Sequence, residues 1–324
     1  MSIPTLISII APAYNEEATL PEFVKRTASV FDEMSDYDCE IVLVNDGSRD
    51  STLEVIRTLK QQYPMITVVN LSRNFGKEIA MTAGLAEADE NADALVIIDT
   101  DLQDPPELIP VLVEKWRSGF DMVYGKRASR DGESSLKKST AAAFYMLMKN
   151  VGSTPIPRDV GDFRLISRRV ADALLMLPEK HRFMKGLFAW VGFPQAEVLY
   201  DRDARFSGAT KWNYWKLWNF AIDGFTSFTI APLKIASYMG FITALSAFVY
   251  GLFVLFKALI WGDSVQGFPT IMLTMLFLGG VQLLVLGVIG EYLGRAFNEV
   301  KQRPLYLIES IDRAERDVSA DESG

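Results

Sequence analysis

The stretch that decides the fold is LVIIDTDLQ, residues Leu95–Gln103. Its apolar half has no helical spacing, which is typical of a strand buried on both faces of a parallel sheet. Asp99 and Asp101 then lie at the carboxyl end of that strand, where open α/β sheets bind ligands. With the amide of Gln103 they form a hard oxygen donor set that suits Mg²⁺ or Mn²⁺. The alternative is a solvated acidic turn before the next helix.

The rest of the first half repeats this pattern. Apolar strands and amphipathic helices alternate about every 25–30 residues, which is typical of βαβ units. We expect strands at 5–11, 39–44, 66–71, 95–98, 121–124 and 159–167. We expect helices at 16–34, 52–62, 78–88 and 107–118. Polar segments that follow the strands are PAYNE (12–16), NDGSRD (45–50), SRNFGKE (72–78), DTDLQD (99–104) and GKR (125–127). The fold class is therefore α/β, with a Rossmann-like, mostly parallel sheet and polar segments that converge at one edge.

Composition excludes several functional classes. The 324 residues carry a net charge of −8, which argues against a nucleic-acid binder. Cys39 is the single cysteine, so an intrachain disulfide is impossible, and His181 is the single histidine, which disfavours a His-based zinc site or a Ser-His-Asp triad. There is no P-loop motif, and no GxGxxG follows the first strand, which argues against a nicotinamide enzyme.

The composition changes after residue 210. Aromatic residues crowd the 212–228 stretch beside Lys211 and Lys216, which predicts an interfacial amphipathic segment at 211–230. The two stretches Ile235–Phe256 and Ser264–Gly290 are uncharged for 22 and 27 residues. Each exceeds the roughly 20 residues that span a bilayer core.

We therefore expect a transmembrane hairpin at 231–297, with spans at about 233–258 and about 266–292. A buried helical hairpin is the alternative. A soluble domain at 1–210 and a tail at 298–324, polar and frayed from residue 312, complete the chain. Lys and Arg flank the hairpin and are absent from its turn, so the positive-inside rule places the domain and both termini in the cytoplasm. We expect a multi-pass protein of the inner (plasma) membrane.

Four motifs resemble a known family. PAYNE at Pro12–Glu16, NDGS at Asn45–Ser48, DTDLQDPPE at Asp99–Glu107 and GDFR at Gly161–Arg164 resemble the family-2 glycosyltransferases of the GT-A fold. The stretch RFSGATKWN and the two-helix tail narrow the resemblance to the polyprenyl-phosphate glycosyltransferases, a group that includes dolichol-phosphate mannose synthases. Within this group the chain is most similar to the bactoprenol glucosyltransferases.

This resemblance implies a set of site residues. The donor nucleotide sugar would be bound by Pro12, Tyr14, Glu16, Asp46, Lys77, Asp99, Thr100 and Arg127. Mg²⁺ or Mn²⁺ would be held at Asp99, Asp101 and Gln103, and Asp162 would be the acidic residue at the reacting centre. Arg205 and Lys211 would bind the lipid phosphate.

The implied activity is inverting transfer of a hexose to a polyprenyl (undecaprenyl) phosphate. Glucose from UDP-glucose is the first expectation, and GDP-mannose and a UDP-aminosugar stay open. A phosphate monoester has a second pKa of about 6, so the acceptor is mostly a dianion at neutral pH and needs little help from a base. We therefore expect Asp162 to orient a sugar hydroxyl, or to hold Arg164 or another cation, instead of accepting a proton.

Other functions compete with this one. A processive polysaccharide synthase would carry a QxxRW motif and more membrane helices, which this sequence lacks. A non-catalytic, membrane-anchored nucleotide-sugar-binding protein remains an alternative. A two-span channel is disfavoured because neither uncharged stretch contains an ionisable residue. Glycines at 279, 280, 287, 290 and 294 permit close helix packing, so we expect a homo-oligomer, a tetramer before a dimer.

Overall fold

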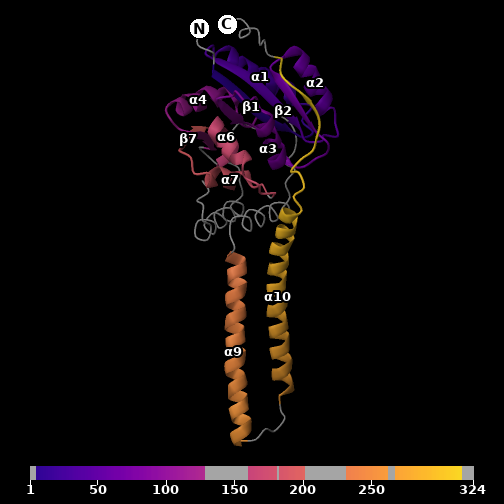
Figure 1. Ribbon diagram of the computed structural model, residues 1–324, viewed down its shortest axis with the longest axis vertical. Helices are drawn as coiled ribbons and strands as arrows, with labels where there is room; N and C mark the ends of the chain where they lie inside the picture. Colours follow the sequence, from indigo (N-terminus) through magenta and orange to yellow (C-terminus); the bar gives the residue numbers. More distant parts are fainter. Residues whose placement is uncertain (1–4, 128–159, 181, 201–230, 262–266, 316–324) are drawn as a thin grey trace.

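The computed structural model describes residues 5–127, 160–180, 182–200, 231–261 and 267–315 (Figure 1). The predicted interfacial segment at 211–230 lies outside the described residues, as do Arg205 and Lys211. The described soluble part is an α/β domain, and two long helices extend from it.

The centre of the domain is an eight-stranded sheet in the order β7-β5-β6-β4-β1-β2-β3-β8. The strands are β1 Thr5–Ala13, β2 Tyr37–Asn45, β3 Ile66–Leu71, β4 Ala94–Ile97, β5 Met122–Arg127, β6 Val160–Ser167, β7 Gln195–Tyr200 and β8 Ile308–Asp312. Strands β1 to β4 are mutually parallel, and β5 is parallel to β7. Strands β6 and β8 run antiparallel to their neighbours. The predicted mostly parallel sheet is therefore confirmed, with two reversed strands that the sequence pattern did not predict.

Helices cover both faces of this sheet. They are α1 Leu20–Asp32, α2 Thr52–Gln62, α3 Lys77–Glu87, α4 Ile109–Arg117 with a 3₁₀ turn η1 at Pro106–Leu108, α6 Arg168–Leu175 and α7 Met184–Trp190. Alternate residues of the strands pack into two cores, one beneath α1, α2 and α4 and the other beneath α3, α6 and α7. All four residues of β4 are buried, as expected for a strand covered on both faces.

Several boundaries differ from the sequence prediction, and three of the differences bear on the site. Helix α1 begins at Leu20 instead of Glu16, because Asn15 has a left-handed φ of 54° and Pro21 occupies the first turn of the helix. The GKR segment at 125–127 is the end of β5 instead of a loop, and it pairs with β7. Residues 195–200 form β7, a strand that is not among the expected ones.

The direction of β6 decides the position of Asp162. Strand β6 pairs with β4 so that Arg164 lies opposite Ile97. In an antiparallel pair, the residue two positions before Arg164 on β6 lies opposite the residue two positions after Ile97. Asp162 therefore lies level with Asp99. A reversed strand thus begins at the edge where the parallel strands end, and it adds its first residues to that edge.

The tail prediction is wrong in part. Residues 308–312 form β8, which pairs with the exposed edge of β3, so the tail is ordered to at least this strand. The carboxylate of Asp312 accepts from Lys60 at 2.9 Å, and Glu87 accepts from Arg313 at 2.8 Å. The chain thus returns to the sheet after the two long helices.

The two long helices are α9 Ala231–Trp261 and α10 Phe268–Val300, and they lie side by side (Figure 1). Among the described residues, one segment is long and apolar enough to cross a membrane: Phe277–Val300, 24 residues with a mean hydropathy of 1.6. The apolar part of α9, Ile235–Tyr250, is shorter. The span predicted at about 233–258, and with it the two-span hairpin, therefore stays a prediction.

Candidate active site

Lys77 connects two carboxylates at the carboxyl edge of the sheet. It is the first residue of α3, and its ammonium lies 2.7 Å from Oδ1 of Asp99 and 2.5 Å from Oδ2 of Asp162. Asp99 follows β4, and Asp162 comes from the start of β6. The structure thus brings together three predicted site residues from three separate elements.

This ion-pair cluster keeps Asp162 ionised. Burial would raise the pKa of Asp162, but the positive charges of Lys77 and then Lys185 outweigh burial and hold that pKa well below its usual range. Burial would likewise lower the pKa of Lys77, but Asp162 and then Asp99 outweigh it and raise that pKa. Asp162 therefore carries a full negative charge at neutral pH and does not serve as a proton donor there.

The metal ligands predicted at the DTDLQ segment lie on a constrained turn. Leu102 is buried with a left-handed φ of 58°, and the Gln103 backbone N–H donates to Oδ1 of Asp101 at 3.1 Å. Burial raises the pKa of Asp99 and outweighs the opposing effect of Lys77, and the carboxylates of Asp162 and Asp101 add to the rise. The buried negative charge at this turn thus favours a nearby cation.

The carboxylates of Asp99 and Asp101 suit a divalent cation whose other coordination positions are filled by a bound ligand. Within the described residues, no three Asp, Glu, His or Cys side chains gather as a metal site made by protein alone. Asp99 and Asp101 could hold Mg²⁺ or Mn²⁺ together with phosphate oxygens, which is the usual environment of Mg²⁺ in nucleotide enzymes. The ammonium of Lys77 supplies the positive charge beside Asp99 in this structure.

Behind the carboxylates, Glu78 links α3 to α7. Its Oε2 accepts from the backbone N–H of Met184, the first residue of α7, at 3.3 Å. Burial and the nearby Asp162 raise the pKa of Glu78 to about 7, although Lys77 and Lys185 oppose the rise. The next residue along α7 is Lys185, whose ammonium lies 4.0 Å from Oδ1 of Asp162.

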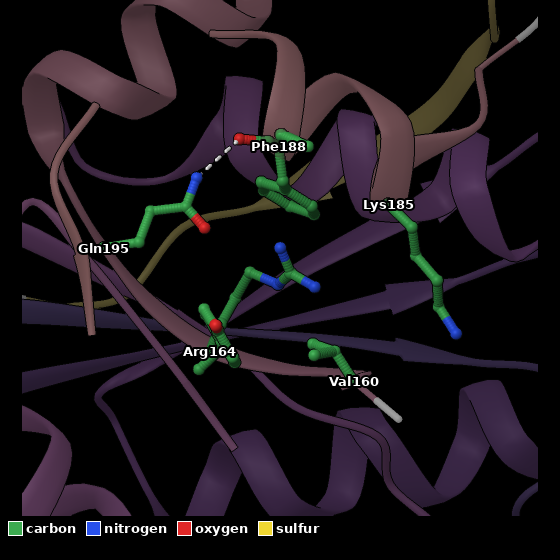
Figure 2. Close-up of a pocket in the computed structure, with 7 residues that line it drawn as sticks. Val160, Arg164, Lys185, Phe188 and Gln195 are labelled. Carbon is green, nitrogen blue, oxygen red and sulfur yellow. Dashed lines mark hydrogen bonds between the residues drawn. The ribbon is translucent and has the colours of Figure 1, made fainter. Parts of the chain in front are cut away.

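A pocket opens beside Asp162, between β6 and α7 (Figure 2). Seven residues line it: Tyr124, Val160, Arg164, Lys185, Phe188, Ala189 and Gln195. The buried guanidinium of Arg164 stacks on the Phe188 ring at 3.7 Å and donates to the carbonyl of Gly161 at 2.9 Å. Arg164 also donates to the backbone carbonyl of Asp162 at 3.3 Å, so this hydrogen bond does not use the carboxylate.

Asp46 organises the loop that leads into α3. Its carboxylate accepts backbone N–H groups from Phe75 at 2.7 Å and Gly76 at 2.9 Å, and the side-chain amide of Asn74 at 3.0 Å. Burial raises the pKa of Asp46, although the two backbone hydrogen bonds oppose the rise. Asp46 is one of the predicted donor-binding residues, and in this structure both of its oxygens hold the loop that positions Lys77.

Comparison with known proteins decides the family. The family model for Glycosyl transferase family 2 matches residues 8–175, and the model for the GtrB C-terminal hairpin matches residues 231–296. The chain belongs to glycosyl transferase family 2. An uncharacterized glycosyltransferase, sll0501, of Synechocystis is 52% identical over 94% of this chain and 95% of its own length.

Two further relatives have more informative names. A prophage bactoprenol glucosyl transferase homolog of Escherichia coli is 45% identical over 95% of this chain and 99% of its own length. The bactoprenol glucosyl transferase of Shigella phage SfII is 45% identical over 95% of this chain and 98% of its own length. Among solved structures, S. aureus TarS 1-349 is 15% identical with a TM-score of 0.40, covering 61% of this chain and 59% of that chain.

The predicted family and the enzyme class are thereby confirmed: the protein is a glycosyltransferase that resembles bactoprenol glucosyltransferases. The match to the GtrB hairpin model and the apolar segment of α10 indicate that this glycosyltransferase associates with a membrane.

The structure also gives the local setting of the other residues predicted for the donor site of this glycosyltransferase. Pro12 lies within β1, Thr100 is buried, and Arg127 ends β5 opposite Tyr200. Glu16 accepts a hydrogen bond from the hydroxyl of Thr19 at 3.0 Å. The donor-binding roles of these residues and of Tyr14 stay predictions.

Sequence reasoning missed two charged residues of this site, Glu78 and Lys185. Lys185 is the single charged residue of α7, whose sequence is otherwise MGLFAW. A lone lysine within an apolar helix of seven residues was the available signal. The sequence pattern could not identify the ion-pair partner of Lys185, because that partner, Asp162, lies on another element.

Substitution of Gly47 in this glycosyltransferase is expected to destabilise the loop that places Lys77. Gly47 has a φ of 61°, and a Cβ there would come within 2.3 Å of the Arg73 carbonyl carbon and 2.4 Å of the Asn74 nitrogen. We expect Gly47→Ala to cost about 2–4 kcal/mol from backbone strain and overpacking. Thermal unfolding of the purified protein in detergent measures this loss. Gly119→Ala is the control, because Gly119 has a φ of 105° but nothing within 4 Å of a Cβ, and it should cost less.

A pH-dependent stability is expected from Glu78 of this glycosyltransferase. Its pKa in the folded protein is about 7 against 4.5 in the unfolded chain, so its contribution to stability is present below pH 4.5 and is lost as the pH rises through 7. Glu78→Gln keeps the acceptor oxygen for Met184 without the charge. We expect the variant to match the wild type at pH 5 and to unfold roughly 2–6 °C higher at pH 8. Melting curves of both proteins across pH 5–8 measure this, and parallel curves would refute it.

Proposed function

We propose that this enzyme transfers glucose from UDP-glucose to a polyprenyl phosphate, undecaprenyl phosphate in particular, with inversion at the anomeric carbon. The observation that carries the proposal is the contact of Lys77 with the carboxylates of both Asp162 and Asp99 at the ligand-binding edge of the sheet. The names of the bactoprenol glucosyl transferase relatives support the sugar and the lipid.

On the donor side, Asp99, Asp101 and Gln103 would hold Mg²⁺ or Mn²⁺ next to the nucleoside diphosphate. The cation, when bound, stabilises the charge that develops on the leaving diphosphate. Lys77 then leaves Asp99 and turns to the donor phosphates while it keeps its contact with Asp162. Pro12, Tyr14, Glu16, Asp46, Thr100 and Arg127 line the nucleotide pocket in this proposal.

Asp162 acts on the sugar without accepting a proton. The acceptor phosphate is already mostly a dianion at neutral pH and attacks without a general base. A fixed negative charge at the reacting centre stabilises the positive charge that develops on the sugar ring in the transition state. Because Lys77 and Lys185 keep Asp162 ionised, that charge is present throughout the neutral range.

The hairpin places this chemistry at the membrane surface. A polyprenyl chain leaves the bilayer only at a cost of about 0.8 kcal/mol for each CH₂ exposed. We propose that α9 and α10 both span the inner membrane, with the catalytic domain and both termini in the cytoplasm. The 211–230 segment lies at the interface, with Arg205 and Lys211 near the lipid phosphate, and the enzyme assembles as a homo-oligomer.

Transfer of a labelled sugar to lipid tests the proposal. Membranes that contain the enzyme are incubated with undecaprenyl phosphate, Mg²⁺ and radiolabelled UDP-glucose, GDP-mannose or UDP-N-acetylglucosamine in separate reactions. We expect labelled lipid with UDP-glucose, a loss of about 10-fold or more on addition of a chelator, and recovery with excess Mg²⁺ or Mn²⁺. Labelled lipid formed only with GDP-mannose would indicate a mannosyltransferase instead of a glucosyltransferase. Absence of labelled lipid with every sugar would refute lipid transfer.

A further inference from the structure

Asp162 has two lysines, one for each of its carboxylate oxygens. Oδ2 accepts from Lys77 at 2.5 Å. Oδ1 is buried and lacks a hydrogen-bond partner among the described residues, and the ammonium of Lys185 lies 4.0 Å from it. That distance is too long for a hydrogen bond, so Lys185 compensates the charge of Asp162 without being held by it.

Lys185 also faces the pocket between β6 and α7. Figure 2 shows the guanidinium of Arg164 beneath the Phe188 ring and the Lys185 side chain extending past them from α7. The side chain of Lys185 is 28% exposed, so its ammonium retains access to a ligand. The pocket thus presents two positive charges from two different elements.

The positive charge of Arg164 in this pocket is offset only in part, by the more distant carboxylates of Asp162 and Glu78. Its described partners are two carbonyl oxygens, the sulfur of Met122 at 3.8 Å and the Phe188 ring. Within the described part of the chain, no carboxylate lies within ion-pair distance of it. Burial lowers the pKa of Arg164 to about 10, a cost that an anion in the pocket would offset.

We propose that Lys185, with Arg164 behind it, binds the phosphate monoester of the acceptor. This inference rests on the proposed function. It assigns one carboxylate oxygen of Asp162 to the donor side of the site and the other to the acceptor side. Lys77 and Asp99 form the donor side at Oδ2, and Lys185 forms the acceptor side at Oδ1. The incoming phosphate is thereby held next to the carboxylate that faces the sugar.

A lysine suits this position because its ammonium is 4.0 Å from the carboxylate of Asp162. A phosphate dianion in direct contact with that ammonium outcompetes the carboxylate at this distance. Glu78 fixes the start of α7 through Met184 and so sets the height of Lys185 above Asp162. Lys185 is a binding residue for the acceptor in this scheme, and Glu78 is a positioning residue.

The test compares three variants of the full-length enzyme in detergent. Lys185→Met removes the charge, Lys185→Arg keeps it, and Lys115→Met removes an exposed lysine from α4 as the matched control. Two measurements are made on each. One is the equilibrium binding of undecaprenyl phosphate, with undecaprenol and inorganic phosphate as separate probes. The other is the KM for each substrate at saturating concentration of the other.

We expect Lys185→Met to weaken binding of undecaprenyl phosphate and raise its KM by about 10-fold or more, with binding of undecaprenol and the KM for UDP-glucose within about twofold of the wild type. Lys185→Arg should recover most of the affinity, and Lys115→Met should match the wild type. If Lys185→Met lowers the melting temperature, Lys185→Gln replaces it.

The outcomes separate this inference from the proposed function. An unchanged affinity and KM for undecaprenyl phosphate in Lys185→Met, with normal transfer by the wild type, would overturn the inference alone. A rise in the KM for UDP-glucose instead would assign Lys185 to the donor and also overturn it. Lys185-dependent binding of undecaprenyl phosphate, without transfer of any sugar, would support the inference and overturn the proposed transfer.

Discussion

Asp162→Asn is expected to lower the rate of sugar transfer by about 10³-fold or more. The asparagine side chain has nearly the same shape, so the change removes the charge without creating a cavity. It leaves Lys77 facing a neutral amide and deprives the sugar of the negative charge that stabilises its transition state. Initial rates of labelled-lipid formation by the purified variant, at saturating donor and acceptor, measure the loss.

Asp172→Asn is the control for this experiment. Asp172 lies on α6 and pairs with Arg168 at 2.9 Å, with its side chain 53% exposed, so its loss should leave the rate within about twofold. Equilibrium binding of UDP-glucose to Asp162→Asn should fall far less than the rate, because the donor is held chiefly at Asp99 and Asp101. A rate near that of the wild type would remove Asp162 from the chemistry.

Lys77→Met is expected to lower transfer by about 10²–10³-fold and to change its pH dependence. Without Lys77, the carboxylates of Asp99 and Asp162 face each other with no cation between them. Burial then dominates at Asp162 and raises its pKa, because the largest opposing charge is gone. Activity needs the ionised form of Asp162, so as the pH is lowered the variant loses activity at a higher pH than the wild type does.

The pH–rate profile of kcat between pH 5 and 9 measures this effect. The wild type should show no acid limb from Asp162 in this range, whereas Lys77→Met should lose rate progressively as the pH falls below neutral. Lys77→Arg should restore the wild-type profile, since it keeps the positive charge. A Lys77→Met profile parallel to that of the wild type would show that Lys77 does not control the charge of Asp162.

Much of the sheet followed from local patterning. The strand predicted at 66–71 is confirmed, and the one predicted at 95–98 is found one residue earlier, at Ala94–Ile97, because an apolar stretch of this length has few other stable placements in an α/β domain. The DTDLQ segment lies at the end of β4, as the pattern predicted. These features depend on residues that are near neighbours in the sequence, so composition and spacing were enough to find them.

Strand direction and strand pairing did not follow from patterning. The alternation of residues in GDFRLIS is the same whichever way β6 runs, yet only the antiparallel direction places Asp162 level with Asp99. The pairing of β8 with β3 joins residues about 240 positions apart, beyond two long helices. Such pairings are set by which sheet edge is left exposed, which is a property of the assembled domain.

The sequence by itself determined the family, the α/β sheet and the polar edge where Asp99 lies, because motifs and hydrophobic periods are local. The tertiary structure decided which charges meet there. Lys77 reaches Asp99 across 22 positions and Asp162 across 85, and Lys185 approaches Asp162 from a helix that the pattern did not predict. Charge compensation between buried groups depends on distances of a few ångströms, and these are fixed only when β4, β6, α3 and α7 pack together.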